Sequence, residues 1–177
     1  MYTDDPFAYE SVRVSSPAPR ASGERPPRRA RPASLHEMPG HLFRRLHQQG
    51  VALYAVHAAG FDLTPVQFAA LHAIGTWPDC DQSSIGRAIA CDKATLGAVL
   101  DRLQAKGLVE RAPDESDRRA WRLRATPEGL ALLERLEPRV AAIQRELLAP
   151  LDAAEARQLM SMLARLVGPL PVPGAGR

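Results

Sequence analysis

The residues with the clearest chemical potential are basic side chains gathered in one stretch of the chain. Positions 82–125 hold nine basic and six acidic residues, an excess of three that equals the net charge of all 177 residues. Lys93 and Lys106 are the only lysines in the sequence, so nearly all of the basic residues are arginines. A guanidinium group offers a planar fork of donors that suits phosphates and the edges of bases. The pattern favours binding of nucleic acid.

Patterns that would support catalysis or metal binding are missing from the sequence. It contains no Gly-x-Ser-x-Gly segment, no phosphate-cradling glycine loop and no paired carboxylates in apolar surroundings. The histidines do not form an i, i+4 pair around a carboxylate, and there is no Cys-x-x-Cys. We therefore expect no enzymatic activity, no metal and no cofactor. The five histidines are interpreted as structural, with a role in a ligand pocket as the alternative: His36, His41, His47, His57 and His72.

Composition narrows the class of protein further. No apolar run approaches the roughly 18 residues that span a bilayer, and the N-terminus lacks the basic and apolar regions of a secretion signal. Cys80 and Cys91 are too few for a disulfide framework, and their scarcity fits a reducing cytoplasm. We expect a cytoplasmic protein in which both cysteines serve packing, with an oxidant-sensing cysteine as the alternative.

The two ends of the chain differ from its middle. Residues 1–35 contain six prolines and six arginines without apolar periodicity, which predicts a disordered tail. This tail is either solvated or an arm that touches DNA phosphates. Residues 36–170 are expected to form one domain, and residues 171–177 a flexible C-terminus.

Two short helices and a hairpin must position the basic residues. The pattern predicts helices over 82–90 and about 93–106, with Asp92 as N-cap of the second and Gly107 ending it. Its buried face would hold Leu96, Val99, Leu100 and Leu103. Residues 108–111 and 121–124 are predicted to pair as strands around a polar connection. This is a winged helix-turn-helix, whose second helix fits the major groove and whose hairpin reaches the minor groove.

Long helices are predicted on both sides of this unit. Two apolar stripes over residues 42–56 suggest a helix that is buried on two sides, between its own domain and a partner, and ends at Gly60. Thr64-Pro65 and Thr126-Pro127 mark helix starts, and Pro138 is expected to bend the helix after the second start. A final helix runs from about Asp152 to Gly168. The buried face of the helix that starts after Thr64 would comprise Val66, Phe68, Ala69, Leu71 and Ile74. The predicted fold class is mainly α with a small β-hairpin wing (α+β).

Six short motifs run through these elements in a fixed order. They are Leu63-Thr64-Pro65-Val66-Gln67-Phe68, Asp92-Lys93-Ala94-Thr95, Asp101-Arg102-Leu103, Lys106-Gly107-Leu108-Val109, Asp114-Glu115-Ser116-Asp117-Arg118-Arg119 and Thr126-Pro127-Glu128-Gly129. In order and spacing they resemble the MarR-type (multiple-antibiotic-resistance regulator) family of bacterial transcription regulators. The resemblance covers about residues 38–168, and its most specific part is the wing motif with aspartates and a double arginine. Ala125 and Leu130 depart from the family, which usually has leucine and commonly a basic residue there.

The resemblance implies a ligand-responsive, DNA-binding transcription regulator. Its helices at about 39–59 and 127–168 would interlock in a homodimer, and a winged lobe at about 62–125 would bind a pseudo-palindromic operator with recognition helices roughly 34–36 Å apart. A repressor released by a small aromatic or phenolic acid, or its derivative, is expected. The alternatives are a redox-sensing regulator, a ligand-independent DNA-binding protein and an RNA-binding winged helix.

The expected DNA contacts fall into three groups. Ser83, Ser84 and Arg87 would touch phosphates, which orient the protein without reading sequence. Lys93, Thr95 and Arg102 would act from the recognition helix, with Arg102 alternatively pairing near Asp101 or with the wing. Asp117 would fix the wing tip, while Arg118 and Arg119 enter the minor groove, where narrow A·T-rich segments attract arginine.

The resemblance also implies an effector pocket between the long helices and the winged lobe. Its expected lining is aromatic, and Arg44 or Arg45 would meet a carboxylate with two hydrogen bonds. The alternative is that these aromatic residues are core and the arginines are solvated. The remaining candidates are Phe43, His47, Tyr54, Phe68, His72 and Trp77.

Overall fold

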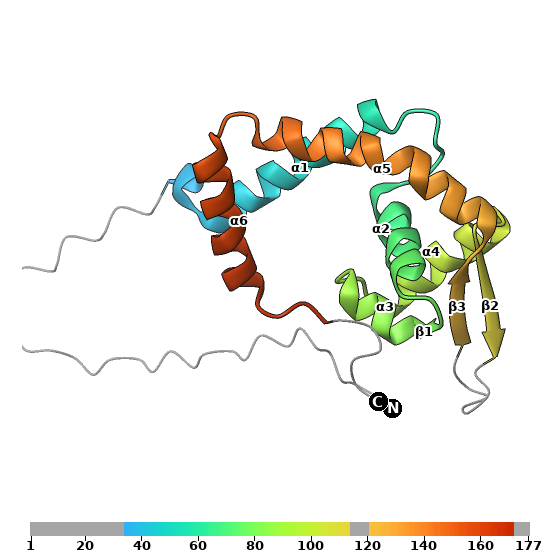
Figure 1. The fold of residues 1–177 in the computed structure, drawn as a ribbon. Coiled ribbons are helices and arrows are strands. Elements are labelled where there is room, and N and C mark those ends of the chain that lie inside the picture. The colour runs from blue at the N-terminus through green and yellow to red at the C-terminus, as the bar shows by residue number, and fades with distance from the viewer. Residues whose placement is uncertain (1–33, 114–120, 172–177) are drawn as a thin grey trace, which may run out of the picture. The chain divides into compact units, whose positions relative to one another are not determined.

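The computed structural model describes residues 34–113 and 121–171, and a compact unit begins at Leu35 (Figure 1). Most of the predicted N-terminal tail lies outside these ranges. The elements are a 3-10 helix at Leu35–Glu37, α1 (Pro39–His57), α2 (Pro65–Thr76), β1 (Cys80–Asp81), α3 (Gln82–Ala88), α4 (Lys93–Ala105), β2 (Val109–Pro113), β3 (Trp121–Ala125), α5 (Pro127–Leu148) and α6 (Ala153–Val167). The mainly helical winged fold predicted from the sequence is confirmed.

The helix starts follow the capping residues that the sequence shows. Thr64, Asp92, Thr126 and Asp152 each adopt an extended backbone, and each side chain accepts a hydrogen bond from the first turn that follows. At Thr64 the cap is reciprocal, because the Gln67 side chain accepts a hydrogen bond from the Thr64 N–H at 3.0 Å. These caps satisfy amide groups that a helix leaves unpaired and so fix where α2, α4, α5 and α6 begin.

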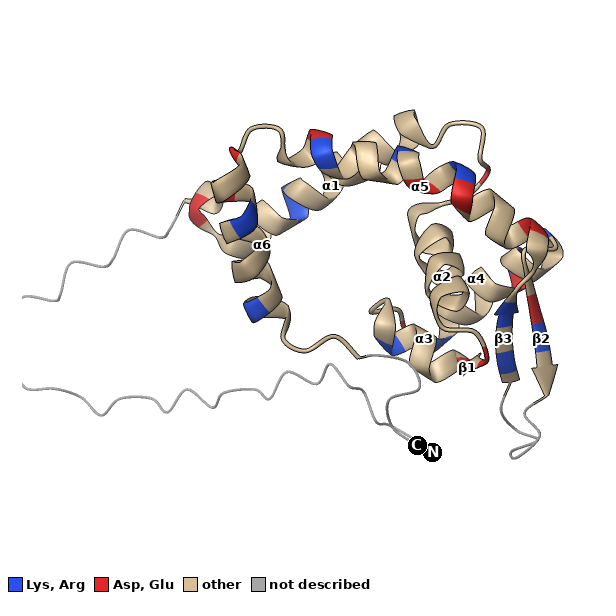
Figure 2. Cartoon of the chain, in the orientation of Figure 1, with Lys and Arg blue, Asp and Glu red and all other residues tan. Residues whose placement is uncertain are grey.

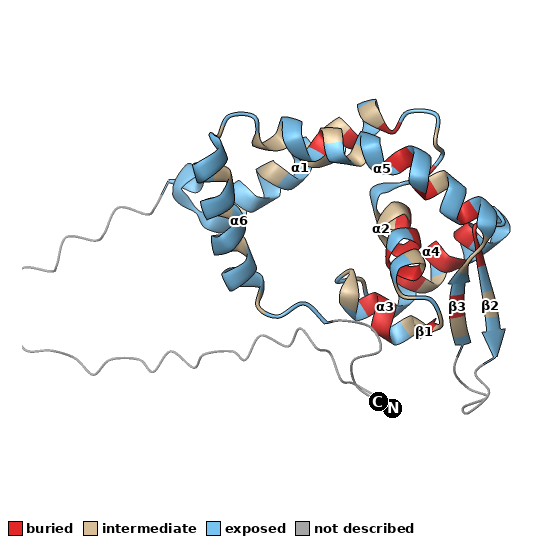
Figure 3. Cartoon of the chain, viewed as in Figure 1, coloured by how far each residue is buried: buried red, intermediate tan, exposed pale blue. Residues whose placement is uncertain are grey.

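The core lies within the winged lobe and extends to the face of the long helix α5 that packs on it. Figure 3 shows buried residues concentrated in α2, α3 and α4 and along part of α5. The four apolar residues predicted to face inward from α4 are all buried. The prediction for α2 is partly wrong: Val66, Phe68 and Ala69 are only half-buried, whereas Gln67, Ala70 and Ala73 are buried. Because α2 contacts α3, α4, α5 and β3, its buried surface is wider than a single stripe.

The wing is part of a three-stranded antiparallel sheet in the order β1-β3-β2. Val109 pairs with Ala125 and Pro113 with Trp121, which extends the predicted hairpin slightly at both strands. Strand β1 was not predicted, since two residues are too short for an alternating pattern. Cys80 of β1 pairs with Leu123, which is fully buried at the centre of the sheet.

The helices α1 and α6 bury little within the chain. Tyr54 is the single buried residue of α1, so the chain itself covers only one side of this helix, and burial of the second side by a partner stays a prediction. Its end also differs from the prediction: α1 stops at His57, and Gly60, with φ +86°, lies beyond the cap at Ala58. No residue of α6 is buried. In the described part of the chain, no helix is long and apolar enough to cross a membrane.

Candidate nucleic-acid interface and ligand cavities

Helix α4 presents its polar N-terminal half away from the core. Lys93, Ala94, Thr95 and Ala98 are exposed, and Gly97 is half-buried, opposite the apolar face that packs on α2. Hydrogen bonds from the side chain and backbone of Thr95 hold the pKa of Asp92 below its usual value, so the N-cap stays ionised. The N-cap therefore holds the first turn of α4 in position. The exposed side chains next to Lys93 on this face are small.

Helix α3 carries a chain of hydrogen bonds that ends at an exposed arginine. The Ser84 hydroxyl donates to Asp81 Oδ2 at 2.6 Å and accepts from the Arg87 guanidinium at 3.0 Å. Burial opposes ionisation of Asp81, but hydrogen bonds from Ser84 outweigh it and lower the pKa of that carboxyl. Ser84 is itself only 8% exposed. Its hydroxyl therefore orients Arg87, contrary to the direct phosphate contact expected from the sequence, whereas Ser83 and Arg87 are exposed.

The base of the wing is held by an aspartate that was not predicted from the sequence. Asp79 accepts two hydrogen bonds from the Arg124 guanidinium, at 2.5 and 3.0 Å, and its carbonyl accepts one from Arg122 at 2.8 Å. Asp79 has φ +64°, a left-handed conformation that aspartate tolerates better than most residues. The preceding Pro78 was the only local sign of this turn. Figure 2 shows the arginines of β3 as blue bands.

The remaining predicted contacts divide between α4 and the wing tip. Asp117, Arg118 and Arg119 lie outside the described residues. Asp101 pairs with Arg111 of β2 at 2.7 Å and so ties α4 to the wing. Arg102 instead faces a pocket beside α1 and α2.

Two adjoining apolar cavities lie between α2 and α5. The larger, about 560 Å³, reaches α3 at Ala88 and Ile89, and the smaller, about 230 Å³, reaches α1 at Val51 and Tyr54. Both are lined by Phe68, Val140 and Gln144.

These cavities bring together half of the predicted effector residues. Tyr54, Phe68, His72 and Trp77 line them, and the rings of Phe68 and His72 lie 5.6 Å apart. His72 is also 3.7 Å from the Glu137 carboxylate. The other predicted residues do not line either of these cavities: Phe43, Arg44, Arg45 and His47. They lie on the N-terminal half of α1, which the chain leaves largely exposed.

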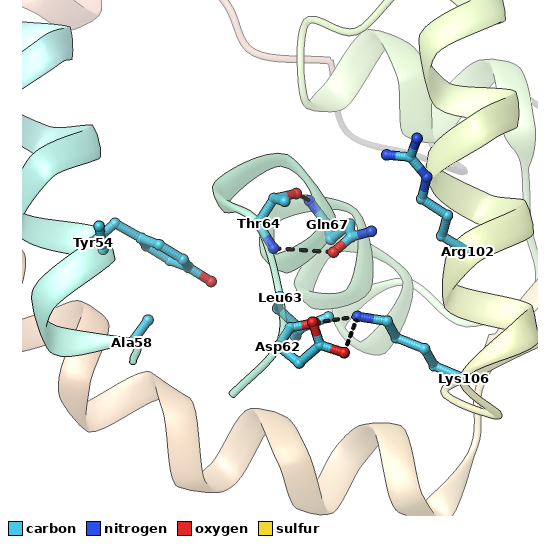
Figure 4. A pocket seen from close by; sticks show the side chains of 9 residues that line it. Tyr54, Ala58, Asp62, Leu63, Thr64, Gln67, Arg102 and Lys106 are labelled. Carbon is cyan, nitrogen blue, oxygen red and sulfur yellow. Dashed lines mark hydrogen bonds and ion pairs between the residues drawn. The ribbon is translucent and has the colours of Figure 1, made fainter. Parts of the chain in front are cut away.

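A third pocket, of about 480 Å³, has a mixed polar and apolar lining and lies at the N-terminal end of α2, where it shares Tyr54 with the smaller cavity (Figure 4). Its walls come from α1, the loop before α2, the start of α2 and the side of α4 that carries Arg102 and Lys106. Tyr54 and Arg102 were predicted for two different roles, and nothing in the sequence indicated that they share a pocket.

The cysteines show no sign of activation. Cys80 is buried and Cys91 half-buried, and burial together with the neighbouring Asp92 raises the pKa of the Cys91 thiol. A raised pKa lowers the fraction of reactive thiolate. Among the described residues, no group of three or more histidine, cysteine or acidic side chains is placed to hold a metal ion.

Comparison with known proteins places this geometry among transcription regulators. The model of the MarR family matches residues 63–121. The transcriptional repressor NicR of Pseudomonas putida is 31% identical over 136 residues, which cover 77% of this chain and 86% of NicR.

Two of the similar solved structures match this chain over most of their own length. The regulator PcaV of Streptomyces coelicolor, in complex with its natural ligand, is 33% identical with a TM-score of 0.72, covering 78% of this chain and 97% of PcaV. BpsR of Bordetella bronchiseptica, whose DNA binding is regulated by 6-hydroxynicotinic acid, is 31% identical with a TM-score of 0.74, covering 78% of this chain and 99% of BpsR.

Proposed function

This chain belongs to the MarR family, and from that premise we propose that it acts as a dimeric transcriptional repressor that a small aromatic acid releases from a pseudo-palindromic operator. The observation that carries the DNA-binding part is the exposed face of α3 and α4. There Arg87 is oriented through Ser84, and Lys93 and Thr95 stand on a capped first turn.

The proposed contacts follow from this placement. Ser83 and Arg87 bind phosphates, Lys93 binds a phosphate or a base edge, and Thr95 contacts a base in the major groove. The wing arginines Arg118 and Arg119 enter the minor groove, and Asp117 fixes the tip. Ser84 acts indirectly by holding Arg87.

The homodimer follows from apolar surface that the single chain leaves uncovered. Exposed large apolar side chains gather on α1 and α6 and at their flanks, and α6 buries none of its residues. Large apolar side chains that are exposed together on two helices are typical of an interface. The residues concerned are Leu35, Met38, Leu42, Phe43, Val51, Val56, Met160, Met162, Leu166, Val167 and Leu170.

The paired apolar cavities are the proposed effector site. Their walls accept an aromatic ring beside Phe68 and Trp77, with polar groups from His72 and Gln144 for orientation. The larger cavity touches the C-terminal end of α3 as well as α5. A ligand that binds more tightly to a state in which α3 is displaced from α5 than to the DNA-binding state would lower the affinity for DNA. The size of this effect is set by the ratio of the ligand's affinities for the two states.

A test combines DNA titration with effector titration. Genomic fragments retained by the full-length protein supply the operator, and binding is measured against salt concentration. The double variant Arg87→Ala/Lys93→Ala should make the salt dependence shallower by about one unit of slope for each phosphate that the variant no longer binds. Arg139→Ala, an exposed arginine on α5, is the matched control. An unchanged slope in the double variant would refute this interface, and failure of every aromatic acid, 6-hydroxynicotinate included, to release DNA would refute the effector proposal.

A further inference from the structure

We propose that Trp121, at the outer end of strand β3, packs against a deoxyribose of the operator backbone. This contact rests on the DNA-binding function proposed above and adds to it a residue that binds DNA through apolar surface. It contributes affinity without neutralising a phosphate or reading the edge of a base.

Trp121 is a large aromatic side chain at the rim of the core. It is 49% exposed, whereas Leu123, two positions further along the same strand, is fully buried. Side chains two positions apart on a strand point to the same face, so Trp121 continues the inward face of β3 beyond the edge of the core. Tryptophan is highly buried in most proteins. About half of this ring system therefore remains available to a partner.

The face of the sheet that carries Trp121 is turned towards the recognition helix. Arg111 lies directly opposite Leu123 in the sheet, and its guanidinium is 2.7 Å from the Asp101 carboxylate of α4. Opposite residues of an antiparallel pair have their side chains on one face, so Arg111, Leu123 and Trp121 point the same way. Trp121 thus lies on the α4 side of the wing, nearer to its tip.

Trp121 also lies next to the start of α3. Asp81, the last residue of β1, pairs with Arg122, so in the same register the chain enters α3 at the level of Trp121. Helix α3 contacts β3 in the fold (Figure 1). The first turn of α3 carries the exposed Ser83, one of the phosphate contacts proposed above. The ring therefore stands between α3 and the outer part of the wing.

This position selects the DNA backbone as the partner. In the proposed complex α4 occupies the major groove and the wing tip enters the neighbouring minor groove, so a sugar–phosphate strand passes between them. Trp121 faces this passage, and Arg118 and Arg119 precede it by three and two positions in the sequence. A deoxyribose is an apolar surface flanked by two phosphates, which suits an aromatic ring flanked by basic residues.

A second copy of the chain suits this surface less well than DNA does. The apolar side chains proposed for the dimer lie on α1 and α6 and at their flanks. Figure 1 shows α6 on the other side of the domain from β2 and β3. Packing of Trp121 in the dimer would therefore need a separate interface.

The first experiment measures operator affinity of the full-length protein against salt concentration. Trp121→Ala should weaken binding about 5- to 30-fold, as truncation of a packed aromatic side chain at an interface does. The slope of the salt dependence should equal that of the wild type, because no charge is lost. Trp121→Phe should recover most of the affinity. Leu130→Ala, the matched control, shortens an apolar side chain on α5 that is 44% exposed and should leave affinity unchanged.

A purely structural role of Trp121 would give a different result. If the ring only held the wing in place, its removal would displace the wing arginines and make the salt dependence shallower. That result, or unchanged affinity of Trp121→Ala, would overturn the proposed contact, while operator binding by the wild type would leave the proposed function standing. A wild type that binds no operator would overturn both.

The second experiment observes the contact by fluorescence. Trp77 and Trp121 are the only tryptophans in the sequence, so in the Trp77→Phe variant all tryptophan emission comes from Trp121. Saturation with operator should lower the quenching of this emission by acrylamide, because the ring becomes covered. A gel shift of the same samples verifies that DNA is bound. Quenching that stays the same in the DNA-bound sample would overturn the contact.

Discussion

Ser84 illustrates how one buried hydroxyl links stability to DNA contact. It bridges the Asp81 carboxylate and the Arg87 guanidinium, so Arg87 is held in one orientation before DNA arrives. An arginine that is already ordered loses less side-chain entropy on binding a phosphate. The hydroxyl therefore contributes to affinity without touching the nucleic acid.

Removing this hydroxyl should lower both the stability of the fold and the affinity for DNA. We expect Ser84→Ala to lower the free energy of unfolding by about 1–3 kcal/mol, because Asp81 loses a buried hydrogen bond, and to reduce operator affinity. Urea denaturation and DNA titration measure the two effects. Ser83→Ala is the matched control, since Ser83 is exposed and its replacement should change stability by less than about 0.5 kcal/mol. Equal stability of the two variants would contradict the bridging role.

Single residues could be predicted from the sequence where the signal was local. Thr64, Asp92 and Thr126 were recognisable as caps because the capping side chain and its amide partners are neighbours in sequence. Asp79 was not, because its partners Arg122 and Arg124 are more than forty positions away. The pocket shared by Tyr54 and Arg102 was missed for the same reason.

At the scale of elements, the turn at Asp79 couples α2 to the sheet. The hydrogen bond from Arg124 holds the pKa of the Asp79 carboxyl below the 3.8 of an unperturbed aspartate. A lowered pKa in the folded state stabilises the protein above pH 3.8, and this contribution is lost as pH falls through the folded value.

Acid should therefore lower the free energy of unfolding of the wild type more than that of a variant without this carboxylate. We expect the unfolding free energy to fall as the pH drops below about 4 towards the lower folded pKa of Asp79, and to fall less steeply in Asp79→Asn. Asparagine tolerates the left-handed backbone, so the turn itself is preserved. Urea denaturation at several pH values gives the slopes, and parallel slopes in the two proteins would exclude the Asp79 contribution.

The junction between the wing and α5 depends on one glycine. A Cβ atom on Gly129, in the first turn of α5, would overlap the backbone carbonyl of Leu108, which precedes β2. Gly129→Ala should destabilise the fold by about 3 kcal/mol, because neither backbone segment has room to move. Gly50→Ala on α1 has open space around it and should be neutral or stabilising by up to about 1 kcal/mol. Thermal unfolding of the wild type and both variants measures this difference in stability.

The elements themselves were predictable to different degrees. Helix α4 was predicted almost to the residue, because its apolar spacing, N-cap and Gly107 all agree. Strand β1 was missed because two residues carry no periodicity, and its pairing with β3 is a long-range contact. The inward face of α2 was misplaced because four elements surround that helix, and only the fold determines which of its sides they cover.

At the scale of the whole molecule, the winged lobe and the long helices differ in how they are stabilised. The lobe contains most of the fully buried side chains, whereas α6 contains none and α1 buries only Tyr54. The double apolar stripe on α1 was visible in the sequence and predicted burial against both the domain and a partner, and the single chain leaves most of this helix uncovered. The difference is explained if a second copy covers this surface, as proposed above.

Breaking the proposed dimer should therefore leave the lobe folded. We expect Leu166→Asp, on α6 where Leu166 is 72% exposed, to shift the protein from dimer to monomer because a charge is placed in an apolar interface. Sedimentation measures the mass, and circular dichroism should change little since Leu166 is mostly exposed in its own chain. Operator affinity should fall by at least 10-fold, because one lobe then binds one half-site. Arg157→Asp, an exposed α6 residue that is already polar, is the comparison. A wild type that sediments as a monomer would contradict the proposal, as would a Leu166→Asp dimer of undiminished stability.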